Sequence, residues 1–319
     1  MQRGLTTMTN NKKPATTVGT SSRRQILVGA LAAPLSFSAL QNSLALAEEL
    51  QPGSQAPWPL WALRKSGQVV YLTAQTPPRP TAWSDTRIEN LIGSCGAIWT
   101  ETRSVWRGNP NTLVRKYGLN LESPLSGSLS GPDYADVRKA AEIAKVPLDS
   151  LEPMRPWLAA SQIESAYFKE KGLKEQGTAE RVLLSKISSD KIRHASEFDA
   201  QDDVITFMGE MSKEEDVQFL QYTVKQIISG TAESERIYGA WANGNRDPAT
   251  EFVAEMKRSQ PSLYAKHVVG RNTNWLPHFT EMQKEAKPSF VIVGIYHMAG
   301  PDSLVEYLKQ DGWEAKYLS

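Results

Sequence analysis

The chain has almost no cysteine and no long apolar run, and each absence excludes a class of protein. Cys95 is the only cysteine among 319 residues, so an internal disulfide and a metal site built on several thiolates are both excluded. Gly-rich phosphate loops and Gly-x-Ser-x-Gly elbows are also absent, which leaves nucleotide binding and serine hydrolysis without support. Beyond residue 48 no stretch is apolar for long enough to predict an integral membrane segment.

Positive charge is concentrated at the start of the chain. The formal net charge is +1, but residues 1–47 hold five cations and no acid, so the remainder carries −4. A mildly acidic remainder argues against nucleic acid as a partner. Peptides or small molecules remain as candidate substrates, and the oligomeric state is not indicated by the sequence.

The first residues have the three parts of a signal peptide. Arg23 and Arg24 follow two serines and precede a short, weakly apolar stretch, after which Ala45 and Ala47 supply a small-x-small cleavage site. Paired arginines are typical of the twin-arginine route. We therefore predict that residues 1–47 are a twin-arginine signal peptide, cleaved after Ala47, and that the mature protein is exported to the periplasm. A disordered basic tail and an uncleaved anchor are the alternatives.

Residues 48–319 alternate strand and helix signals, which is typical of an α/β fold. The middle, about 110–270, is mostly helical. Because a loop and a short helix separate the first two predicted strands, we expect these strands to be parallel neighbours. Strands are predicted at 68–73, 96–100, 191–195, 290–293 and 313–318. Helices are predicted at 85–91, 132–145, 156–168, 178–188, 200–208, 214–231 and 234–242.

Polar residues follow several of these strands. Gly294 ends the apolar strand at 290–293, and His297 lies in the next loop, before a helix that we expect to begin with Pro301 in its first turn. Glu101 closes the strand at 96–100, and the loop from Gln75 follows the strand at 68–73. Since the carboxyl ends of parallel strands share one edge of a sheet, we expect the side chains of Glu101 and His297 to lie close together there.

Each candidate residue has a functional and a structural interpretation. His297 could act in acid–base chemistry or bind a ligand, and Glu101 could be a general base or a metal ligand. Arg271 could stabilise developing negative charge or clamp a carboxylate, or it could form a structural ion pair with Glu101. Glu197 is a weaker candidate metal ligand, and Asn272 is expected in a turn.

Taken in order, several motifs resemble the TraB/GumN family, which is related to TIKI-type proteases, erythromycin esterases and haem-binding ChaN-like lipoproteins. The resemblance implies an α/β fold with a central mixed sheet flanked by helices and a large helical insertion. It also implies two Gly-x-x-His motifs. The motifs that carry it are Arg155-Pro156-Trp157, Trp241-Ala-Asn-Gly244, Arg271-Asn272-x-x-Trp275, Gly294-Ile-Tyr-His297-Met-Ala-Gly300 and Leu308-x-x-x-Gly312-Trp313.

The resemblance further implies divalent-metal-dependent hydrolysis. Glu101, His297 and Arg271 would be the catalytic residues, and His297, Glu101 and Glu197 would bind manganese or zinc. The first Gly-x-x-His motif is incomplete, because Pro77 stands where its histidine is expected, and proline has no ligand atom. We therefore expect an exported, peptidase-like hydrolase relative with an incomplete metal motif.

Two other functions stay open. The missing histidine favours a non-catalytic periplasmic binding or scaffold protein. Tyr296 and His297 together suggest a protein that binds haem or iron.

Overall fold

The structure, a computed structural model, describes residues 58–187, 190–230 and 232–318. The predicted signal peptide and its cleavage site lie outside these residues, so export stays a prediction. In the described part of the chain, no helix has both the length and the apolar character needed to cross a membrane.

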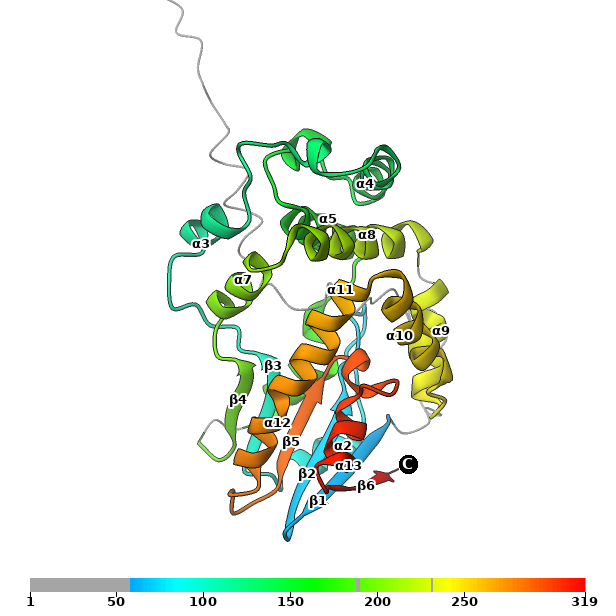
Figure 1. Ribbon diagram of the computed structural model, residues 1–319. Coiled ribbons are helices and arrows are strands. Elements are labelled where there is room, and N and C mark those ends of the chain that lie inside the picture. Colours follow the sequence, from blue (N-terminus) through cyan, green and yellow to red (C-terminus); the bar gives the residue numbers. More distant parts are fainter. Residues whose placement is uncertain (1–57, 188–189, 231, 319) are drawn as a thin grey trace, which may run out of the picture.

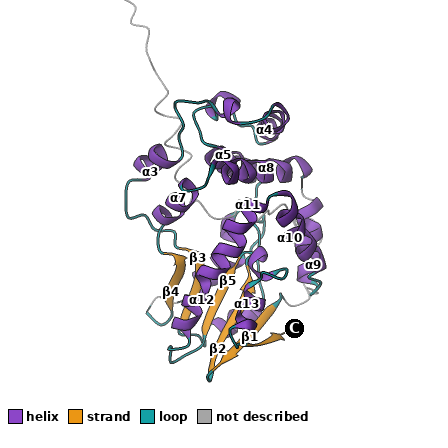
Figure 2. Ribbon diagram, viewed as in Figure 1, coloured by secondary structure: helices purple, strands orange, loops and turns teal. Residues whose placement is uncertain are grey.

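One six-stranded mixed sheet forms the centre of the fold, in the order β4-β3-β5-β2-β1-β6 (Figure 1). Strands β4, β3, β5 and β2 are parallel, whereas β1 is antiparallel to both β2 and β6. Helices surround this sheet, which confirms the predicted α/β class (Figure 2). The strands are β1 Leu60–Lys65, β2 Gln68–Ala74, β3 Ala97–Thr102, β4 Arg193–Phe198, β5 Ser289–Val293 and β6 Glu314–Leu318.

The sheet differs from the prediction in two places. Strands β2 and β3 are not neighbours, because β5 lies between them and pairs with both. All five residues of β5 are buried, and so apolar a strand is best accommodated at the centre of a sheet covered on both faces. Strand β1 was not predicted. It forms a hairpin with β2 through Ser66 and Gly67, whose φ values of 50° and 82° suit a two-residue turn.

The described helices include the six predicted in the middle of the chain, together with α3, α10 and α11, which were not predicted. A π-helical segment, η5 Ala265–Gly270, precedes α12, and a single 3₁₀ turn, η6 Ile295–Met298, follows β5. The α-helices are α2 Thr86–Ile92, α3 Pro110–Tyr117, α4 Gly131–Ile143, α5 Pro156–Glu170, α6 Ala179–Lys186, α7 Gln201–Gly209, α8 Lys213–Ser229, α9 Ala232–Ala242, α10 Asp247–Ser259, α11 Pro261–Tyr264, α12 Arg271–Met282 and α13 Leu304–Gln310.

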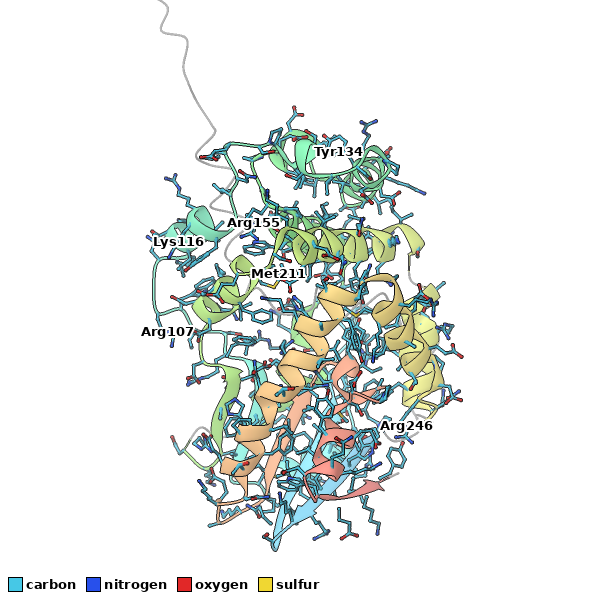
Figure 3. The ribbon with its side chains drawn as sticks, in the orientation of Figure 1. Arg107, Lys116, Tyr134, Arg155, Met211 and Arg246 are labelled. Atoms are coloured by element: carbon cyan, nitrogen blue, oxygen red, sulfur yellow. The ribbon has the colours of Figure 1, made fainter. Side chains whose placement is uncertain are left out.

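Helices α4, α5 and α8 lie beyond the carboxyl ends of the parallel strands, while α12 and α13 cover one face of the sheet (Figure 1). The side chain of Arg155 joins the helices above this edge (Figure 3). Its Nε donates to Asp216 Oδ2 at 2.8 Å, and its terminal nitrogens donate to the backbone oxygens of Tyr117, Gly209 and Met211 at 3.1, 2.6 and 3.1 Å. One guanidinium therefore fixes α3, α5, α7 and α8 relative to one another.

Candidate functional site

Glu101 and His297 meet at the carboxyl edge of the sheet, as the sequence led us to expect. Glu101 lies near the end of β3, and His297 lies in the η6 turn directly after β5. His297 Nε2 is 3.3 Å from Glu101 Oε1, and the backbone N–H of Gly294 donates to the same oxygen at 2.5 Å. Because strand ends and a tight turn hold both side chains, their contact is fixed by the backbone of the fold.

Arg271 joins this pair to a second carboxylate. Its Nε lies 3.1 and 3.2 Å from the two carboxylate oxygens of Glu197, and its Nη2 lies 2.5 Å from Oε2. The same Nη2 is 3.5 Å from Glu101 Oε2. Burial lowers the pKa of Arg271, but the carboxylates of Glu197 and Glu101 raise it by more than burial lowers it. The net shift of the pKa is therefore upward. One guanidinium is thus shared by two buried carboxylates.

Asn272 orients the imidazole of His297. It was expected in a turn, and this was wrong, because Asn272 is the second residue of α12 and fully buried. Its Nδ2 donates to the backbone oxygen of Asp302 at 2.6 Å, and its Oδ1 lies 2.6 Å from His297 Nδ1. Since the amide oxygen can only accept, Nδ1 carries the proton of a neutral imidazole and Nε2 faces Glu101.

The π-helical segment η5 immediately precedes the two residues that α12 contributes to the centre. A π-helical turn holds one residue more than an α-helical turn and so changes the direction in which the following residues point. Arg271 and Asn272 come directly after η5. His267, inside η5, is buried against Met211 Sδ at 3.3 Å and against the ring of Phe219.

The contact between His297 and Glu101 brings an imidazole nitrogen and a carboxylate together in a buried site. Burial lowers the pKa of His297 well below its usual range, and the positive charge of Arg271 lowers it further. With the imidazole proton on Nδ1, Nε2 of His297 and Oε1 of Glu101 lie 3.3 Å apart, and each can accept a proton from a group bound between them. The pair can therefore give or take a proton, which is the requirement for acid–base chemistry.

Two polar residues at this edge were not among the predicted site residues. Gln75 donates from its backbone N–H to Val293 O at 2.6 Å, and its Nε2 donates to Glu180 Oε2 at 3.2 Å. Burial, together with the negative charges of Glu101 and Glu175, raises the pKa of Glu180 to about 7. In sequence, Glu180 is one of several acids at helix starts, so only the fold distinguishes it.

The start of the C-terminal helix also needs correction. It was expected to begin at Pro301, but α13 begins at Leu304. Ser303 is its N-cap and accepts the backbone N–H of Glu306 at 3.4 Å. A serine oxygen can accept a hydrogen bond from the first turn of a helix, and this favours Ser303 over the proline as the helix start. Because α13 begins at Leu304, the backbone oxygen of Asp302 lies outside the helix and accepts a hydrogen bond from the side-chain amide of Asn272.

The side chains as placed do not form a shell for a divalent ion. Among the residues that the structure describes, no three His, Cys, Asp or Glu side chains are grouped to hold a metal. The guanidinium of Arg271 contacts both carboxylates that were expected to be ligands, and Pro77 offers no donor atom. A catalytic zinc site uses about three protein ligands. Manganese or zinc binding therefore stays a prediction without geometric support.

Comparison with known proteins identifies a family for nearly all of the described chain. Residues 59–316 match the TraB/PrgY/gumN family. No curated protein and no solved structure matches the chain significantly.

Proposed function

Because this chain belongs to the TraB/PrgY/gumN family, we propose that it is an exported, hydrolase-like protein with an acid–base centre formed by Glu101 and His297. The observation that carries the proposal is the pairing of these two side chains at 3.3 Å, with Asn272 holding the other nitrogen of the imidazole at 2.6 Å. An acid–base pair whose base is oriented by a third group is the arrangement that activates a water molecule or a nucleophile.

The proposed reaction is hydrolysis of a carbonyl compound, either a peptide or a small molecule. Glu101 takes a proton from water as the water oxygen attacks the carbonyl carbon and the C=O π electrons move onto the carbonyl oxygen. The C=O bond then re-forms as the bond to the leaving nitrogen or oxygen breaks, and the proton passes from the Glu101–His297 pair to that leaving atom. Arg271 acts as a positioning residue, because its guanidinium holds Glu101 and Glu197 in place. The side chains of Glu101, His297 and Arg271 are 6, 3 and 2% exposed, so substrate entry requires movement of the helices that cover this edge.

The test uses the mature protein purified from periplasm and treated with EDTA. We expect it to hydrolyse 4-nitrophenyl acetate or fluorescein-labelled casein. We also expect Glu101→Gln and His297→Asn each to reduce the rate about 10²-fold or more. Glu142→Gln, a change of an exposed carboxylate in α4, is the matched control and should leave the rate unchanged. Equal rates in the wild type and Glu101→Gln would refute acid–base catalysis. A rate that appears only after manganese or zinc is added would instead support the metal-dependent reaction implied by the resemblance.

The second candidate function, non-catalytic binding, is favoured by the near-complete burial of the centre and by Pro77. It predicts no turnover from any variant. The haem or iron alternative has less support, because Tyr296 Oη lies 2.7 Å from Tyr222 Oη and both nitrogens of His297 are in contact with other side chains. The absorbance spectrum of the purified protein tests it.

A further inference from the structure

Arg79 lies on the loop that follows β2, and the backbone holds it firmly. Its N–H donates to Lys174 O at 3.2 Å, and its oxygen accepts from the N–H of Lys174 at 3.1 Å. The loop passes so close to Gly177 that a Cβ there would lie 3.0 Å from both Arg79 Cγ and Arg79 O. Pro78 and Pro80 on either side restrict the backbone further. The position of the side chain is therefore set by the fold.

The charge of Arg79 is buried without a counter-charge. The part of the chain that the structure describes contains two buried arginines, Arg79 at 8% exposure and Arg271 at 1%. Arg271 pairs with two carboxylates, as shown above. No ion pair or side-chain hydrogen bond of Arg79 is found among the described residues, and its Nε is buried without a partner. Its two terminal nitrogens are not among the buried unpartnered atoms, so they reach the surface.

An unpaired guanidinium in this position is costly. Arginine does not lose its proton in proteins, and taking an unpaired charge out of water is unfavourable. Burial alone lowers the pKa of Arg79, with no neighbouring carboxylate to oppose it. A fold that keeps such a group recessed, with its tip at the surface, provides a site for an anion from outside.

We propose that Arg79 is an oxyanion-binding subsite, which takes a carboxylate or phosphate group of the molecule that this protein handles. The two terminal nitrogens of a guanidinium can bind two oxygens of such a group at once. Arg79 belongs to the same loop as Gln75, which follows β2 and contacts Glu180 at the carboxyl edge of the sheet. The proposal goes beyond hydrolysis, because a non-catalytic binding protein could use the same subsite.

The simplest alternative is that only the aliphatic stem of Arg79 matters and the charged head is tolerated. Arg79→Met separates the two interpretations, because methionine keeps an apolar stem but has no charge and no donor. Arg115→Met is the matched control, since Arg115 is exposed on α3. We expect Arg79→Met to fold with a midpoint temperature no lower than that of the wild type, because it removes an unpaired buried charge.

The experiment follows the Nε–H signal of Arg79 by nuclear magnetic resonance, in mature protein labelled with ¹⁵N. The signal is assigned by its absence in Arg79→Met, and its burial protects it from exchange with water. We expect it to shift in a saturable way when sodium acetate or sodium phosphate is added at constant ionic strength. A larger shift with acetate assigns a carboxylate ligand, and a larger shift with phosphate assigns a phosphate ligand. No shift with either probe would overturn the proposal, as would equal stabilisation of the wild type and Arg79→Met by both anions.

Discussion

Arg271 is the residue on which the buried charges depend most, because it contacts the carboxylates of both Glu197 and Glu101. Replacing it with methionine leaves two carboxylates without a cation. We expect Arg271→Met to lower the free energy of unfolding by about 3–5 kcal/mol, and adding Glu197→Gln to recover part of the loss. Urea unfolding monitored by circular dichroism measures both. Arg115→Met is the control, with a change of about 0.5 kcal/mol or less. Equal losses of unfolding free energy in Arg271→Met and Arg115→Met would contradict the role of Arg271 as the cation of both buried carboxylates.

Glu180 makes stability depend on pH. Its pKa in the folded protein is about 7, above the ordinary 4.5, so the folded state binds the proton more tightly than the unfolded state. The stabilisation is therefore complete below about pH 4.5 and is lost as the pH rises through about 7. Because Glu180 is partly exposed, we expect a contribution of only about 1–2 kcal/mol. Glu180→Gln should flatten the decline of the unfolding free energy over this range, and Glu142→Gln should not. An unchanged slope in Glu180→Gln would show that its carboxyl titrates normally.

At the scale of elements, the close contact of α3 and α7 depends on a glycine. A Cβ on Gly209 would lie 2.5 Å from Tyr117 Cδ1 and 2.6 Å from Tyr117 Cβ, whereas a Cβ on Gly239, inside α9, would meet nothing within 4 Å. We expect Gly209→Ala to cost about 1–3 kcal/mol through overpacking. Gly239→Ala should stabilise the protein by about 0.5–1 kcal/mol through helix propensity. Thermal unfolding of the two variants compares them directly. A loss of stability in Gly239→Ala larger than that in Gly209→Ala would contradict the packing described for α7.

The sequence predicted the individual helices and strands better than it predicted which of them lie next to one another in the fold. The apolar runs of β2 and β5 were visible, as were the main helices, because local periodicity encodes them. The position of β5 between β2 and β3 depends on pairing between distant segments, so no local pattern shows it. The contact of Glu101 with His297 followed from strand ends alone. The roles of Asn272 and Glu180 did not, because each depends on contacts with a segment distant in the chain.

At the scale of the whole molecule, α4, α5 and α8 lie beyond the sheet edge where the centre is located (Figure 1). The η6 turn that carries His297 packs against α10 and α13, and Tyr222 of α8 reaches Tyr296 of this turn at 2.7 Å. Twin-arginine export, which carries folded proteins, would deliver this arrangement intact. We expect Arg23→Lys with Arg24→Lys to leave precursor in the cytoplasm, and the mature protein to begin at Glu48. Cell fractionation and N-terminal sequencing test both expectations. Periplasmic protein with Met1 still in place would contradict them.

The central claim is that Glu101 and His297 act as one acid–base unit. It is tested most directly by a double-mutant cycle of kcat/KM on EDTA-treated mature protein, with the wild type, Glu101→Gln, His297→Asn and the double variant. Residues that act as a unit give non-additive losses. We predict that each single change reduces kcat/KM about 10²-fold or more and that the double variant loses no more than the worse single variant. Losses that multiply in the double variant, or single variants as fast as the wild type, would contradict the account.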